Sequence, residues 1–173
     1  MSQNQLSNVL EAVLLAAGRP VSIAQMLELF DEQQRPTAEE IQAALAELDA
    51  RCAERACELR EVASGWRLQV RPDHAEIVSR LWQERPTRYS RALLETLALI
   101  AYRQPITRSE IEDVRGVTVA STIMRTLHER NWVRVVGHRE VPGRPELLGT
   151  TREFLDYFGL KSLDDLPTLA ELR

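Results

Sequence analysis

Few side chains in this sequence are of the types that perform catalysis or bind metals, and their spacing favours neither. The chain has two cysteines, Cys52 and Cys57, and its three histidines are at positions 74, 128 and 138. A structural zinc site needs closely spaced pairs of such ligands, and no histidine is near the two cysteines in the sequence. We therefore predict no metal site and two free thiols, as expected in a reducing cytoplasm.

The stretch VPGRPELLGTT at residues 141–151 has the glycines of a phosphate-binding loop but not its spacing. A Walker-type loop reads G-x-x-x-x-G-K-[ST], and its lysine reaches the phosphate. Here five residues separate Gly143 from Gly149, and Thr150 stands where the lysine would be. No cluster in the sequence combines a nucleophile with a base. We predict that the protein is not an enzyme and uses no cofactor or small-molecule substrate.

Composition and charge restrict the class of protein further. The chain has 173 residues and a formal net charge of −4. It contains no apolar run of the roughly 18 residues that a membrane-spanning helix needs, and its amino terminus lacks the pattern of a signal peptide. Residues 88–150 carry 10 Lys/Arg against 7 Asp/Glu, a charge of only +3. We expect a cytosolic protein that binds DNA weakly at most.

Two parts of the chain repeat the same pattern. LEAVLLAAGRPVSIAQM at residues 10–26 matches LETLALIAYRQPITRSEI at residues 94–111 after one inserted residue. In the first copy a proline precedes Ser22 and Gln25, and in the second a proline precedes Thr107 and Glu110. Each S/T-x-x-Q/E pair is the signature of a capping box at the start of a helix. The agreement in register predicts a duplicated domain.

Each copy continues with a further helix and two strand-like runs. In the first copy a helix opens at Thr37, and a hairpin is predicted around Ser64-Gly65. In the second copy VPGRPELLGTT becomes the tip and return strand of a hairpin, and Thr150 is predicted to cap the next helix with Glu153. Three helices followed by a hairpin is the order of a winged helix-turn-helix domain.

The predicted fold is therefore mainly α with small β-hairpins (α+β), in two tandem winged helix-turn-helix domains. The first domain is expected at residues 1–85 and the second at 88–150. A short helix and tail would occupy residues 151–173.

Two functions suit winged helices. A DNA-binding transcription regulator would place the third helix of a domain in the major groove. However, the third helix of the first copy carries several acids, and Glu110, Glu112 and Asp113 crowd the helix that precedes the third helix of the second copy. An interaction module is the other possibility, because the predicted helix RALLETLALIAY at residues 91–102 is apolar nearly all round, and the opening helix carries Leu15 outside its main apolar stripe. Packing within the same chain would also explain those faces.

The segments ALLETLALIAYRQPITRSEIEDVRGV and GRPELLGTTREFLDYFGLKSLDDLPTL resemble those of the ScpB family, the segregation and condensation protein B of bacteria. Members of that family usually have a tyrosine where this chain has Leu148. The resemblance implies a non-enzymatic homodimeric adaptor of chromosome condensation and partition. Its partners would be the kleisin ScpA and, through it, the SMC ATPase, in a cytoplasmic complex associated with the nucleoid.

Two surfaces are predicted to meet these partners. The apolar stripe of the first helix is the candidate dimer interface, with Leu6, Val9, Leu10 and Val13. The second wing is the candidate kleisin interface, with Gly143, Arg144, Pro145 and Leu148, because two prolines stiffen it and little entropy is lost on binding. The alternative is that the glycines only satisfy backbone geometry and that Arg144 is solvated.

Overall fold

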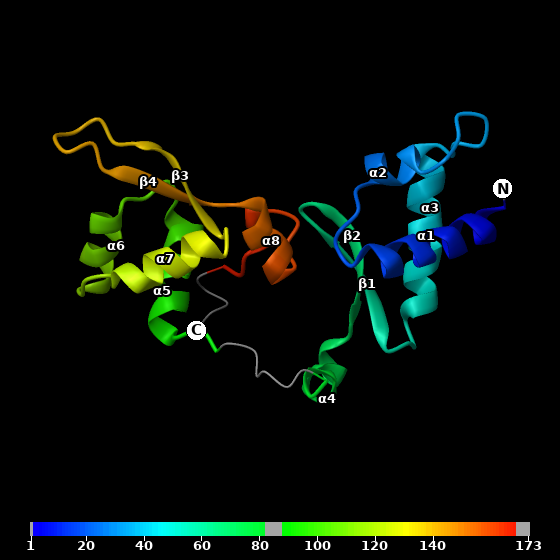
Figure 1. The fold of residues 1–173 in the computed structure, drawn as a ribbon, viewed down its shortest axis with the longest axis horizontal. Helices are drawn as coiled ribbons and strands as arrows, with labels where there is room; N and C mark the ends of the chain where they lie inside the picture. The colour runs from blue at the N-terminus through cyan, green and yellow to red at the C-terminus, as the bar shows by residue number, and fades with distance from the viewer. Residues whose placement is uncertain (1, 82–87, 169–173) are drawn as a thin grey trace. The chain divides into compact units, whose positions relative to one another are not determined.

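Each half of the chain folds into three helices followed by an antiparallel hairpin in the computed structural model, which describes residues 2–81 and 88–168 (Figure 1). The chain divides into two units. The first domain comprises Met1–Pro86 with Gly159–Ser162, and the second comprises Thr87–Phe158 with Leu163–Arg173. The boundary predicted between residues 85 and 88 falls within 82–87, which lie outside the described residues.

The helices of the first domain begin at side-chain caps that the sequence signals. Ser2, Ser22 and Thr37 each form a capping box with the glutamine or glutamate three residues later. Such a cap gives the first backbone N–H groups of a helix an acceptor, which fixes where each helix starts. The elements in chain order are α1 (Gln3–Ala17), α2 (Ile23–Glu28), α3 (Ala38–Cys52), β1 (Cys57–Val62), β2 (Gly65–Val70), a 3₁₀ turn (Pro72–His74) and α4 (Ala75–Ser79).

The apolar stripes of the three helices meet in one core. The members of that core are all less than a tenth exposed, and burying each such side chain contributes about 1.5–3 kcal/mol. They include Leu6, Leu10, Leu14, Met26, Ile41, Leu45 and Leu48.

The first hairpin is held against the helices by a bridge between Val21 and Trp66. Each residue donates its backbone N–H to the carbonyl of the other, at 2.8 and 2.9 Å. The strands pair from Cys57 with Val70 to Val62 with Gly65, so the two-residue turn is residues 63–64. The predicted turn at Ser64-Gly65 was therefore wrong by one residue, because Gly65 already belongs to β2 and lies against Val21.

The second domain repeats this arrangement. Its capping box joins Thr107 to Glu110, and its bridge joins Ile106 to Leu148 in the way that Val21 is joined to Trp66. The duplication predicted from the sequence is thus present in the backbone. The elements are α5 (Arg91–Arg103), α6 (Arg108–Arg115), α7 (Ser121–Glu129), β3 (Val133–His138), β4 (Glu146–Thr150), α8 (Arg152–Phe158) and a 3₁₀ turn (Leu163–Asp165).

The start of α8 differs from the prediction. The hydroxyl of Thr151, not Thr150, accepts the backbone N–H of Phe154 at 3.1 Å. Thr150 is instead held by the side chain of Gln104, which accepts its N–H at 2.8 Å and donates to its hydroxyl at 2.9 Å. The aromatic side chains of α8 pack on Trp132, with ring centroids 4.6 Å (Tyr157) and 5.4 Å (Phe158) away.

The fold is α+β, with two tandem winged helix-turn-helix domains. Within the described residues, no helix combines the length and the apolar content needed to cross a bilayer.

Candidate protein-binding surface around the second wing

The wing of the second domain is the hairpin of β3 and β4 with its seven-residue loop, residues 139–145. The loop is held by its own backbone: Arg139 N–H donates to Pro145 O at 3.0 Å, and Arg144 N–H donates to Val141 O at 2.9 Å. Gly143 has φ +87°, and no atom lies within 4 Å of where its side chain would be. The tip is therefore ordered by local bonds and stands clear of the rest of its domain.

Arg144 is presented at this tip. Its side chain is 70% exposed and pairs with Glu140 at 3.2 Å, four residues earlier. An exposed pair of this kind contributes little stability, so a partner can exchange it for its own acceptor. The φ of Arg144 is +39°, in the left-handed region that a non-glycine residue seldom adopts.

Leu148 does not reach the surface of the wing as predicted. It is 2% exposed, and both its backbone groups bond Ile106, at 2.8 and 3.2 Å. The expectation that Leu148 fills an apolar spot on a partner is corrected, because β4 turns this side chain toward the core of its own domain. Its neighbour Pro145 remains half-buried at the edge of the loop.

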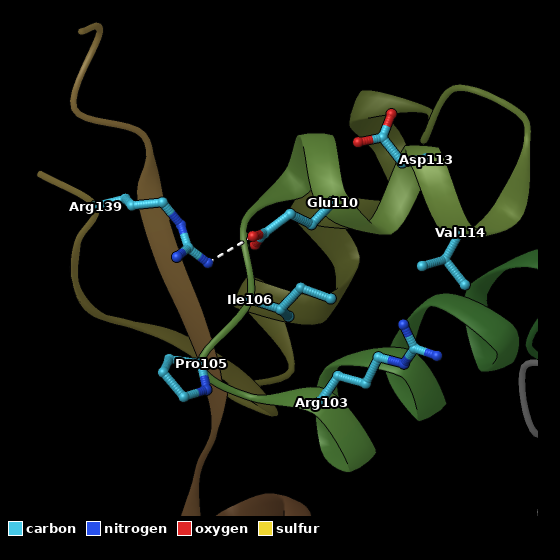
Figure 2. A pocket seen from close by; sticks show the side chains of 7 residues that line it. All are labelled: Arg103, Pro105, Ile106, Glu110, Asp113, Val114 and Arg139. Atoms are coloured by element: carbon cyan, nitrogen blue, oxygen red, sulfur yellow. Dashed lines mark hydrogen bonds and ion pairs between the residues drawn. The ribbon is translucent and has the colours of Figure 1, made fainter. Parts of the chain in front are cut away.

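A hollow of about 360 Å³ lies between the wing and the helices (Figure 2). Seven residues line it: Arg103, Pro105, Ile106, Glu110, Asp113, Val114 and Arg139. In Figure 2 the guanidinium of Arg139 reaches from the start of the wing loop to the carboxylate of Glu110 on α6, and the distance between them is 2.5 Å. This ion pair forms one wall of the hollow and ties the wing to α6.

The side chain of Glu110 accepts three hydrogen bonds at once. Its Oε2 accepts the N–H of Thr107 at 2.8 Å and the hydroxyl at 3.0 Å, while its Oε1 takes the Arg139 bond. The backbone N–H of Thr107 first, and then Arg139, lower the pKa of this carboxyl below its usual value. The carboxylate is ionised, so its roles are cap and tether, not acid–base chemistry.

A second hollow, of about 230 Å³, brings two of the predicted wing residues together. Pro145 and Leu148 both line it, with Leu148 below the surface. The other lining residues are Arg108, Ser109, Met124, His128 and Glu146. The wing thus has a hollow toward α5 and α6 and another toward α6 and α7. Sequence reasoning missed both hollows and Arg139, since the pairing of Arg139 with Glu110 depends on the register of the hairpin.

Helix α7 carries a single Lys or Arg side chain. Arg125 is exposed on it, as are Ser121 and Thr122. Asp113 is exposed on the preceding helix, where it would face phosphates, and the charge of +3 on residues 88–150 supports few phosphate contacts.

The predicted dimer residues are divided between the core and the surface. Leu6 and Leu10 are 4% and 0% exposed and belong to the core of their own domain. Those two residues are therefore corrected to core positions, while Val9 is 39% exposed and Val13 is half-buried. Leu15 lies on the same helix outside the apolar stripe and is 66% exposed.

No cluster of three or more His, Cys, Asp or Glu side chains that could hold a metal occurs in the parts of the chain that the structure describes. Cys52 and Cys57 are free thiols with their sulfur atoms 4.0 Å apart. Burial first, and then the neighbouring Cys57, raise the pKa of Cys52 to about 11. The thiol of Cys52 is therefore protonated at neutral pH.

Comparison with known proteins places this chain among the subunits of one complex. A sequence profile described as "Segregation and condensation complex subunit ScpB" matches residues 8–169. The "Segregation and condensation protein B homolog" of Coxiella burnetii is 53% identical over 172 residues, which cover 99% of this chain and 82% of that protein.

Solved structures include similar chains. The crystal structure of ScpB from Mycobacterium tuberculosis is 34% identical, with a TM-score of 0.43, and the match covers 92% of this chain and 98% of that one. A structure described as the dimer of an ScpB N-terminal domain complexed with an ScpA peptide is 26% identical, with a TM-score of 0.39, over 44% of this chain and 93% of that one. With a family profile matching nearly its whole length, the chain belongs to the ScpB family of segregation and condensation subunits.

Proposed function

We propose that this protein is a non-enzymatic adaptor subunit of a condensin-like SMC–kleisin complex. It binds the kleisin ScpA and, through it, the SMC ATPase, and takes part in chromosome condensation and partition. The complex lies in the cytoplasm on the nucleoid, and contact of this subunit with DNA is weak or indirect. Membership in the ScpB family supports the class of complex. The observation that carries the adaptor role is the second wing, whose ordered tip stands free beside two hollows.

The kleisin contact is proposed at the wing tip, with Gly143, Arg144 and Pro145. Arg144 keeps a left-handed backbone conformation, and such strained positions concentrate at binding sites. The loop is already bonded to itself, so it loses little conformational entropy when a partner docks. Pro145, which lines the second hollow, contacts an apolar side chain of the kleisin beside the arginine.

The test is the affinity for purified ScpA, measured by calorimetry. Arg144→Glu should weaken binding roughly tenfold, because it replaces a cation at the rim by an anion. Arg125→Glu is the matched control, since it makes the same charge change on the exposed face of α7. Equal effects of the two variants would refute the wing contact. Nanomolar, sequence-selective DNA binding at physiological salt would instead favour the transcription regulator.

The homodimer is proposed through α1 of the first domain, with Val9 and Val13 at the interface. Leu15 adds a large exposed apolar side chain to the same helix. Light scattering should give a mass close to twice the 19.7 kDa of one chain at micromolar concentration. A monomer mass at that concentration would refute the dimer.

A further inference from the structure

The two hairpins can be matched residue by residue through their bridges to the helices. Trp66 bonds Val21 and lies opposite Glu61, while Leu148 bonds Ile106 and lies opposite Val135. Glu61 of β1 therefore corresponds to Val135 of β3. One residue earlier on each strand is an exposed arginine, Arg60 on β1 and Arg134 on β3. The repeat thus places an arginine at the same position of both outer strands.

In the first domain a short piece of chain, residues Gly159–Ser162, which belong to this unit, bonds the side chain of Arg60 on β1 and the backbone of the turn residue Ala63. The backbone N–H of Ala63 donates to the carbonyl of Leu160 at 3.0 Å. The Nε and Nη2 atoms of Arg60 donate to the carbonyl of Gly159 at 3.3 and 3.1 Å. Lys161 also pairs with Glu61. The arginine of β1 and the N–H of the first turn residue thus hold two consecutive carbonyls.

In the second domain the corresponding edge of β3 is open. Since Leu148 directs both backbone bonds to Ile106, the opposite residue Val135 directs its own N–H and C=O away from β4. Among residues 2–81 and 88–168, none outside the hairpin bonds the backbone of Val135, and none pairs with the side chain of Arg134. Val135 and Val136 are 39% and 46% exposed.

We propose that an extended segment of the kleisin adds to the outer edge of β3 as a short strand, with one of its carbonyls held by Arg134. The inference rests on the proposed function and specifies how the partner meets the same wing. Strand addition satisfies an open edge through backbone hydrogen bonds, and side-chain pockets supply specificity.

The chemistry of β3 defines the segment that fits. The strand carries Arg134 and no acid, while Arg139 after it already pairs with Glu110, so an acidic side chain beside Arg134 is favoured. Beside Val135 the segment presents an apolar side chain. The irregularity in pairing between Val135 and Gly137 interrupts the edge. Regular pairing along this edge is therefore limited to a short stretch.

Hydrogen exchange of the wild-type protein with and without purified full-length ScpA tests the backbone contact. The amide of Val135 should be protected at least about tenfold in the complex, because it gains an acceptor. The amide of Arg134 is already bonded within the hairpin and should change little. A complex in which Val135 exchanges at its free rate overturns the strand addition.

Affinity for ScpA tests the arginine. Arg134→Ala should weaken binding roughly tenfold, the lower end for a hydrogen bond from a charged donor. Arg125→Ala, which removes the same charge from α7, should leave the affinity within about twofold. Equal losses of ScpA affinity in the two variants would overturn the strand addition at Arg134, but not the binding of the kleisin to this protein. If wild-type protein does not bind ScpA at all, the proposed function fails and this inference fails with it.

Discussion

Replacing Gly65 by alanine should destabilise the first domain more than the same change at Gly18, another glycine of this domain with a positive φ. Gly65 has φ +133°, and a side-chain Cβ there would overlap the carbonyl group of Val21 and lie 2.6 Å from the N–H nitrogen of Ser22. Those atoms are backbone, so they cannot rotate aside. Relief requires the hairpin to move away from Val21, which breaks the bridge to Trp66.

The magnitude follows from the two parts of this cost. An alanine forced into a sparsely populated backbone region costs about 1–3 kcal/mol. The two backbone hydrogen bonds between Val21 and Trp66 contribute about 1 kcal/mol each. The expected loss in the free energy of unfolding is therefore about 3–5 kcal/mol. Gly18→Ala is the control, since Gly18 has φ +59° with no atom within 4 Å of its Cβ position, and it should cost only about 1 kcal/mol.

Urea unfolding followed by circular dichroism measures both variants. With a slope of about 2 kcal/mol per molar urea, the loss at Gly65 lowers the midpoint by roughly 2 M, and the loss at Gly18 lowers it by about 0.5 M. Hydrogen exchange assigns the loss to a domain: peptides from β1 and β2 should exchange faster, while those from α5 to α7 should not. A midpoint for Gly65→Ala at or above that of Gly18→Ala would refute the reasoning.

Three further predictions concern the pH response, the thiols and the helix α1. The pKa of the Glu110 carboxyl is lower in the folded domain than in the unfolded chain, so its ionised form stabilises the folded domain. This contribution to the free energy of unfolding is complete above the unfolded pKa and is lost as the pH falls through the folded pKa. The melting temperature of wild type should therefore fall more steeply below about pH 4.5 than that of Glu110→Gln, and parallel curves would contradict this. Iodoacetamide at pH 8 should label Cys57 before Cys52, because Cys52 is buried and has a pKa of about 11. Peptide mass spectrometry would measure the order of labelling, and faster labelling of Cys52 would be inconsistent with the structure. Leu10→Ala should lower the free energy of unfolding by about 2–5 kcal/mol through the cavity it leaves. Val9→Asp should leave the melting temperature within a few degrees of wild type and shift the mass from light scattering toward that of the monomer. A stable dimer of Val9→Asp would exclude this residue from the interface.

The repeat and the fold class could be predicted because they depend on local signals. Ser22 and Thr107 are each the N-cap of a helix, and the glutamine or glutamate three positions later completes a capping box. Hairpin details could not be predicted in this way. Gly65 and Thr150 were assigned one position off, since the register of each hairpin is fixed by the bridges at Val21 and Ile106, far away in sequence.

The candidate sites were harder to predict, because exposure is a property of the packed domain. The stripe of α1 contains both core and surface residues, and sequence periodicity cannot separate Leu10 from Val9 at its edge. Leu148 follows an exposed loop, but its place on β4 buries it. Arg144 needed no such information, since a charged residue beside a glycine in a tight loop is exposed in any register.

The attachment of the second wing has a mechanical consequence. Arg139, at the start of the wing loop, is bonded to the same carboxylate that caps α6, and Gln104 at the end of α5 holds Thr150 at the end of β4. A pull on the wing tip is therefore carried into two helices at once, through an ion pair at one end of the hairpin and an amide at the other. A force applied at this loop would therefore act on α5 and α6 together with the hairpin.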